Sequence, residues 1–200
     1  MKRKTKLIPK GYHAVTPYLS VKGAADAIIF YKKAFGAKEI MRVPGPNGTI
    51  GHAEVQIGDS RIMLADEFPE MNFRSPRSVG GTPVTIHLYV QDADKVAQKA
   101  LAAGAKLLRP VSDQFYGDRS GSLEDPFGHV WHVATHIEDI PTKELKKRAA
   151  AMASSAEKGY RSAPSRIVST PRVEYYLTDK GKSLGRPRAE GVARMGARHL

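Results

Sequence analysis

The stretch Leu19-Ser20-Val21, followed by an amphipathic run that ends Phe35-Gly36-Ala37-Lys38, decides the fold because the chain repeats it. The second copy begins Leu88-Tyr89-Val90 and ends Ala103-Gly104-Ala105-Lys106, and extended segments follow each copy. A turn glycine follows the valine by 37 residues in the first copy and by 38 in the second. The repeat predicts two tandem β-α-β-β-β modules whose mixed sheets form a cup, a shape typical of small-molecule sites.

Apolar periodicity places the helices and strands of an α+β fold. It predicts helices over 24–35 and 93–103, closed by Gly36 and Gly104, with Asp92 as a cap for the second. Strands are predicted over 14–21, 39–43, 49–57, 61–65, 84–90, 106–110, 120–124 and 129–137. Asp125-Pro126-Phe127-Gly128 has the residue pattern of a type I turn. The Pro- and Gly-rich residues 67–83 read as a loop over the cup mouth, and Asp66, Glu67 and Glu70 as solvated acids.

Composition restricts the classes of protein. The chain has 200 residues, 41% of them hydrophobic, and no cysteine, so disulfides and thiolate metal sites are excluded. No apolar run approaches the roughly 20 residues that span a bilayer, and no signal sequence is recognisable. We therefore expect a cytoplasmic protein without membrane association.

The net charge of +12 is concentrated at the two ends of the chain. Residues 1–10 carry five Lys or Arg and no acid, residues 11–141 carry 13 against 15 acids, and residues 142–200 carry 14 against five. The repeat region therefore has no net positive charge that would attract a polyanion, and the basic N-terminal tail is expected to be solvated.

Strand alternation separates an apolar face, which packs on the helices, from a polar face, which lines the cup. The polar faces hold several imidazoles, which favours a binding cavity over a solvated surface. The candidate pocket residues are Thr16, Tyr18, His52, Glu54, Gln56, Met63, Thr85, His87, Tyr89, Tyr116, Arg119 and His132.

Three motifs resemble the glyoxalase/bleomycin-resistance/dioxygenase group, the vicinal oxygen chelate superfamily, and above all its PhnB-like branch. They are Pro17-Tyr18-Leu19-Ser20-Val21 with its helix, Gly117-Asp118-Arg119-Ser120-Gly121, and the turn leading to Gly128-His129-Val130-Trp131. The resemblance covers residues 11–140, with modules at 11–66 and 84–140, and implies a homodimer. It does not fix the reaction, because this fold hosts isomerases, dioxygenases, transferases and drug-binding proteins.

Glyoxalase-type members of this group hold a divalent metal with one ligand each from the first, fourth, fifth and eighth strands. Those positions fall here at Thr16, Met63, Thr85 and His132, and only His132 suits such an ion. The resemblance therefore does not carry the glyoxalase metal chemistry to this chain. A displaced divalent metal site built from His52, Glu54, His87 and His132 stays open beside a pocket of hydrogen-bonding residues.

Two further residues are candidates for direct chemistry. Arg119 is expected either at the cup rim, binding a carboxylate, phosphonate or enolate oxygen, or in an ion pair with Asp118 or Glu124. His132 is the candidate general acid or base, because an imidazole titrates near pH ~6.5. His129 and Trp131 face away from it and are expected to be structural.

The C-terminal part is predicted as a basic helix at 141–152, a linker at 153–171 and a fragment at 172–200. That fragment resembles the wing of HxlR-type winged-helix regulators. It lacks a preceding helix-turn-helix, so specific nucleic-acid binding is not expected.

Three function classes follow for a small-molecule-binding protein of this group. The first is an enzyme, a lyase, isomerase or dioxygenase, acting on a small oxygen-rich ligand. The second is a protein that sequesters a drug or metabolite without turnover. The third is a ligand-sensing, DNA-associated regulator, which the missing recognition helix disfavours.

Overall fold

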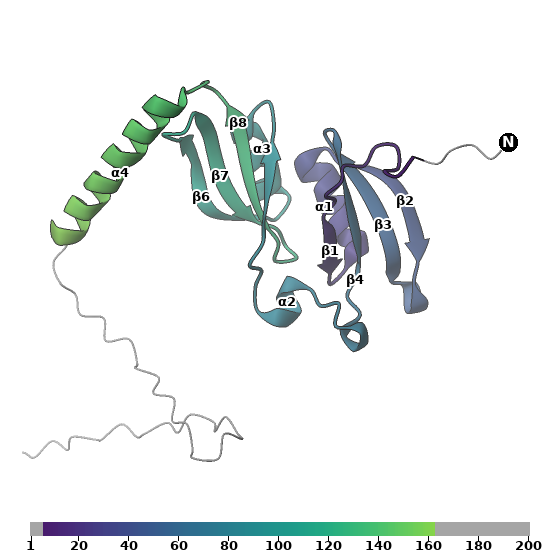
Figure 1. Ribbon diagram of the computed structural model, residues 1–200. Coiled ribbons are helices and arrows are strands. Elements are labelled where there is room, and N and C mark those ends of the chain that lie inside the picture. Colours follow the sequence, from purple (N-terminus) through teal and green to yellow (C-terminus); the bar gives the residue numbers. More distant parts are fainter. Residues whose placement is uncertain (1–5, 163–200) are drawn as a thin grey trace, which may run out of the picture. The chain divides into compact units, whose positions relative to one another are not determined.

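A computed structural model, which describes residues 6–162, confirms the α+β fold of two tandem modules (Figure 1). The first module contains β1 (Tyr18–Val21), α1 (Ala24–Phe35), β2 (Lys38–Pro44), β3 (Ile50–Ile57) and β4 (Ser60–Asp66). The second contains β5 (Thr85–Tyr89), α3 (Ala93–Ala102), β6 (Lys106–Asp113), β7 (Asp118–Glu124) and β8 (Val130–His136). The repeated sequence therefore gives a repeated structure.

The two sheets have the same topology. Their strand orders are β1-β4-β3-β2 and β5-β8-β7-β6. The pairs β1/β4 and β5/β8 are parallel, and the other neighbours are antiparallel. Strands β1 and β5 are edge strands of their sheets, as are β2 and β6.

Acidic side chains fix the start of each long helix in the modules. Asp66, at the end of β4, accepts hydrogen bonds from the backbone N–H groups of Gly23 and Ala24 at 2.9 Å and of Ile50 at 2.7 Å. Asp92 caps α3 as predicted, accepting from the N–H of Lys95. The expectation that Asp66 is a solvated acid is therefore wrong, because its carboxylate satisfies amides at the start of α1.

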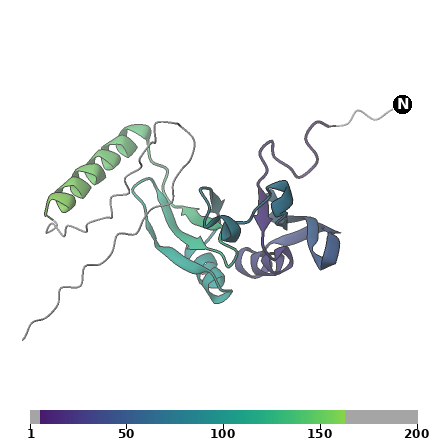
Figure 2. The ribbon, with the colours of Figure 1, turned by 90° about the horizontal axis from the view of Figure 1, so that it is seen from below.

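The modules share one hydrophobic core in which α1 and α3 are in contact (Figure 2). Trp131 of β8 is fully buried, and its ring centroid lies 4.5 Å from that of Phe35 and 5.3 Å from that of Tyr31, both on α1. Its predicted role in the core is confirmed. The apolar faces of both sheets therefore bury themselves against the same pair of helices.

A buried carboxylate joins the two modules at the predicted turn. The carbonyl of Asp125 accepts from the N–H of Gly128 at 3.0 Å, which confirms the turn. The Asp125 side chain accepts from the Tyr31 hydroxyl at 3.0 Å and from Trp131 Nε1 at 2.9 Å. It also accepts from the N–H groups of Phe127 and His129, both at 2.9 Å. Four donors thus compensate the burial of this charge.

Several boundaries differ from the prediction. Strand β1 begins at Tyr18 rather than at residue 14, and Thr16 Oγ1 donates instead to the carbonyl of His13 in a preceding turn. Loop 67–83 contains two short helices, η2 (Pro69–Met71) and α2 (Pro76–Val79), and η1 (Pro46–Gly48) precedes β3. Glu67 accepts from the backbone and the hydroxyl of Ser75, so it orders this loop and is not a solvated acid.

Helix α4 (Thr142–Ser162) ends ten residues beyond the predicted basic helix at 141–152 and enters the segment predicted as a linker. Arg148 donates to both carboxylate oxygens of Glu138 at 2.8 Å. Among the helices that the structure describes, none is both long and apolar enough to cross a bilayer. Residues 1–5 of the basic tail, the rest of the linker and the fragment at 172–200 lie outside the described residues.

Candidate ligand-binding site

A groove of about 600 Å³ lies along the edge strands β1 and β5. Tyr18 from β1 and Thr85 and His87 from β5, all candidate pocket residues, line it. Loop 67–83 supplies apolar side chains to the same groove, and the ring of Phe73 lies 5.3 Å from that of Tyr18. The remaining lining residues are Pro17, Leu19, Ser20, Asn72, Arg74, Pro76, Val79, Gly81, Thr82, Pro83, Val84, Ile86 and His129.

His87 connects this groove to a polar cluster on the second sheet. The register of β5 and β8 places it beside His132, with ring centroids 4.8 Å apart. Ser122 Oγ of β7 lies 3.0 Å from His132 Nδ1, and Arg109 Nη2 of β6 lies 3.3 Å from both ring nitrogens. Burial, His87 and Arg109 outweigh the opposing charge of Asp118 and lower the pKa of His132, so its imidazole is neutral near pH ~7.

A second polar cluster lies on the first sheet. The Tyr18 hydroxyl is 3.0 Å from His52 Nδ1, and Glu54 lies between His52 at 3.5 Å and Arg61 at 2.9 Å. Burial raises the pKa of Glu54, but hydrogen bonds from Tyr12, His52 and Arg61 outweigh it and lower the pKa overall. This carboxylate is therefore held as an anion by partners of its own module.

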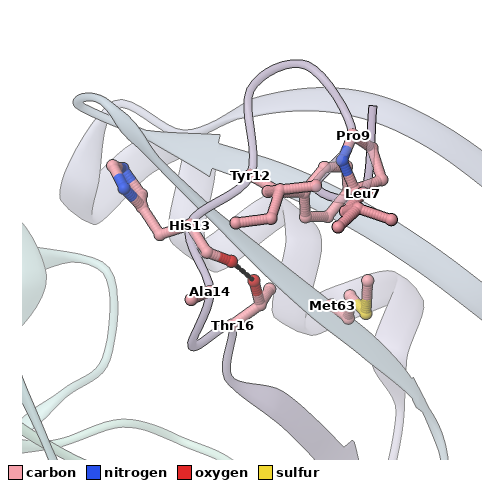
Figure 3. Close-up of a pocket in the computed structure, with 8 residues that line it drawn as sticks. Leu7, Pro9, Tyr12, His13, Ala14, Thr16 and Met63 are labelled. Atoms are coloured by element: carbon pink, nitrogen blue, oxygen red, sulfur yellow. Dashed lines mark hydrogen bonds between the residues drawn. The ribbon is translucent and has the colours of Figure 1, made fainter. Parts of the chain in front are cut away.

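A smaller hollow of about 470 Å³ lies where the N-terminal segment meets the first sheet (Figure 3). Thr16 and Met63, both predicted pocket residues, line it together with residues 7–9 and 12–14. The guanidinium carbon of Arg61 lies 4.6 Å from the ring centroid of Tyr12, a cation–π contact. The segment after residue 10 thus packs on the polar face of the first module.

A third group lies at the other end of the second sheet. Asp118 is buried and accepts from the Tyr89 hydroxyl at 2.9 Å, and His136 Nδ1 lies 2.8 Å from it. The Tyr116 hydroxyl lies 3.2 Å from Ser120 Oγ. Tyr89 and Tyr116 therefore contact neighbours on their own sheet and do not line the groove.

Two predicted pocket residues have other roles. Arg119 donates to Asp94 at 2.6 and 2.9 Å and to Asp113 at 2.8 Å. Its side chain lies on the helix-facing side of β7, the same side as the buried Leu123. Arg119 is therefore not at the rim of the cup, and it pairs with neither Asp118 nor Glu124. Gln56 donates to the carbonyl of Gly58 and closes the turn between β3 and β4.

The four residues of the displaced metal site that the sequence left open do not come together. His52 lies beside Glu54, and His87 lies beside His132, as two separate pairs. In the part of the chain that the structure describes, no three His, Asp or Glu side chains gather in a way that could hold a metal ion. The guanidinium of Arg109, next to His132, places a positive charge where a cation would bind. The donor set around His87 and His132 therefore does not fit a divalent metal.

Strand register shows which residues lie beside the ligand positions assigned by resemblance. Thr85 pairs with Val130, whereas His87 pairs with His132. On the first sheet Met63 pairs with Tyr18, and Thr16 precedes the strand. His132 therefore lies beside His87 rather than Thr85, and Met63 lies beside Tyr18 rather than Thr16.

Sequence reasoning missed Arg109, Ser122 and Tyr12. Ser122 alternates with Leu123 on β7, so strand alternation could have identified it. Arg109 lies between two register shifts in the pairing of β6 with β7, and these break the alternation on which the face assignment depends. Tyr12 precedes the first strand, where no periodicity applies.

The chain belongs to the glyoxalase/bleomycin resistance protein/dioxygenase superfamily, whose family model matches residues 12–133. It is 45% identical over 147 residues to protein Mb0911c of Mycobacterium bovis, which covers 72% of this chain and 95% of that protein. It is 26% identical to protein YjdN of Escherichia coli over 150 residues, 64% of this chain and 99% of that protein. The resemblance of residues 172–200 to a winged-helix wing receives no support from these comparisons.

Solved structures agree with the fold. The crystal structure of the Arabidopsis thaliana gene product At5g48480 has a TM-score of 0.50 and 27% identity, and covers 61% of this chain and 98% of that one. Protein PA1353 of Pseudomonas aeruginosa has a TM-score of 0.52 at 23% identity, covering 62% and 98%. These likenesses place the chain among proteins built from the same paired modules.

Proposed function

We propose that the protein binds a small organic molecule in the groove along β1 and β5. The observation that carries this proposal is the groove of about 600 Å³, whose lining combines apolar side chains with a few polar ones such as Tyr18, Arg74 and His87. Small-molecule sites combine such walls with a few polar groups that orient the ligand. Membership of a superfamily that includes drug-resistance proteins and enzymes agrees with this function.

The dye prodan, an uncharged naphthalene whose fluorescence shifts in apolar surroundings, tests the groove. Val84 lines the groove and is 65% exposed, so Val84→Glu places a charge in the groove without disturbing the core. Replacing about 1 kcal/mol of apolar contact by a charge weakens prodan binding at least about fivefold. Val15→Glu is the matched control, since Val15 is 85% exposed and lies outside the groove.

Saturable prodan binding that Val84→Glu weakens and Val15→Glu leaves unchanged supports the proposal. Absence of saturable binding, or equal loss in both variants, contradicts it.

A second candidate function, proton transfer on the bound molecule, is favoured by the state of His132. Its imidazole is neutral and lies within hydrogen-bond distance of the Ser122 hydroxyl, an arrangement suited to a general base. The alternative is sequestration without turnover. Once a ligand is identified, His132→Gln separates the two, because it abolishes turnover by an enzyme but has no turnover to abolish in a sequestering protein.

We also propose that a second copy of the chain covers the outer edges of the sheets. Strands β2 and β6 are edges with exposed apolar side chains, namely Ile40, Met41, Val43, Leu107 and Leu108. Exposed apolar edge strands favour association. Light scattering should give the mass of a dimer, and Leu108→Lys should shift it toward the monomer while Val15→Lys does not. A monomer at micromolar concentration contradicts this proposal.

A further inference from the structure

Arg109 differs from other arginines of the sheets in its partner. On the other strands, Arg42, Arg61 and Arg119 each pair with a carboxylate. Within the described residues Arg109 has no such pair, and its hydrogen-bond partner is the imidazole of His132, 3.3 Å away. A guanidinium against a neutral ring keeps most of its five donors free for a ligand.

The groups around Arg109 are donors or neutral side chains. His132 of β8 lies 3.3 Å from it, and the ring of His132 in turn contacts Ser122 of β7 at 3.0 Å and the ring of His87 of β5 at 4.8 Å between centroids. The two acids on the same face are already bound, since Asp118 contacts Tyr89 and His136, and Glu124 lies 3.3 Å from Arg77. No carboxylate of this face therefore competes for the Arg109 guanidinium.

We propose that Arg109, His87 and His132 bind an oxyanion group, a phosphonate, phosphate or carboxylate, of the molecule held in the groove. The inference rests on the proposed function and names its ligand class. His87 belongs to both sites, so a ligand with its apolar part in the groove reaches the cluster with its anionic end. Arginine matches the planar arrangement of such oxygens with two parallel hydrogen bonds, and imidazoles add further donors.

The same arrangement explains why the paired histidines do not form a metal site. The Arg109 guanidinium lies 3.3 Å from both ring nitrogens of His132, so it repels a divalent cation bound through His132 and attracts an anion there. Strands β5 and β8, which by resemblance carry metal ligands in glyoxalase-type proteins, thus bind an anion in this chain.

Methylphosphonate and acetate are the probes, titrated into the full chain while the ring signals of its histidines are followed by NMR. The wild type should show saturable shifts of the His87 and His132 signals with at least one of the two anions. Preference for methylphosphonate identifies a phosphonate or phosphate group, and preference for acetate a carboxylate. Arg109→Gln should weaken binding at least tenfold and Arg109→Lys by less, while Arg42→Gln, the matched control on β2, should leave it unchanged.

Equal affinity in wild type and Arg109→Gln, with thermal denaturation showing that the variant is folded, overturns the inference. Stoichiometric binding of Mn²⁺ alone at His87 and His132 also overturns it. If the wild type binds prodan but neither anion, the ligand class is wrong and the groove proposal stands. If it binds an anion but not prodan, the groove proposal fails alone.

Discussion

Replacing Tyr31 by phenylalanine removes one of four hydrogen bonds to the buried carboxylate of Asp125 and leaves the ring packing unchanged. Tyr31 is fully buried on α1, and Asp125 lies in the turn of the second module, so the bond joins the two modules. A hydrogen bond to a charged group contributes about 1.5–3 kcal/mol. We therefore expect Tyr31→Phe to lower the free energy of unfolding by about 2 kcal/mol.

The stability difference between wild type and Tyr31→Phe should also depend on pH. Burial and the charge of Asp125 raise the pKa of the Tyr31 hydroxyl well above its ordinary value. Because the folded-state pKa is raised, the contribution is complete below the unfolded pKa near ~10 and is lost as the pH rises beyond it. The difference between wild type and Tyr31→Phe should then shrink by about 1 kcal/mol between pH ~10 and ~11.

Urea denaturation at neutral and alkaline pH measures both quantities, and Tyr116→Phe is the control. The Tyr116 hydroxyl hydrogen-bonds only to the neutral Ser120, so this substitution should lower the free energy of unfolding by about 1 kcal/mol or less. A Tyr31→Phe protein as stable as the wild type at neutral pH, or a difference independent of pH above ~10, would refute this account of the junction.

Three further predictions concern the scaffold around the site. Asp66→Ala leaves three backbone amides without their acceptor and should lower the free energy of unfolding by about 3 kcal/mol. Urea denaturation measures this loss. An unchanged midpoint would contradict the prediction by showing that water replaces the carboxylate. Gly117→Ala should cost more than about 1 kcal/mol, because φ is +91° and the added methyl would overlap the carbonyl oxygen of Glu138; a melting temperature equal to the wild type contradicts this. A hydrogen bond with Asp118 raises the pKa of His136, so the contribution of this pair is complete below pH ~6.5 and is lost as the pH rises through the raised value. His136→Gln should therefore destabilise the protein in mild acid and have little effect at pH ~9, and the reverse order in thermal denaturation would contradict it.

The fold was predictable because duplication leaves two copies of every signal. Helix α1 was predicted to the residue from its apolar face and Gly36, and the turn at Asp125 from its four residue types. Burial of Trp131 followed from alternation along β8. In each case a local pattern and the tertiary packing favour the same structure.

The site was less predictable, because its geometry depends on register between distant strands. His87 and His132 are adjacent only because β5 and β8 pair in the observed register, and one sequence contains no measure of that register. Arg119 points to the helix side, where Asp94 of α3 binds it, although its rim-like motif suggested a ligand contact. The irregular pairing of β6 concealed Arg109.

Chemical-shift mapping of the backbone amides during a prodan titration tests the groove most directly. We expect the shifts to concentrate at residues 17–20 and 83–87, on the edge strands β1 and β5, and at loop residues 72–82. Shifts confined to residues 7–16 around the smaller hollow, or an absence of saturable shifts anywhere, would contradict it.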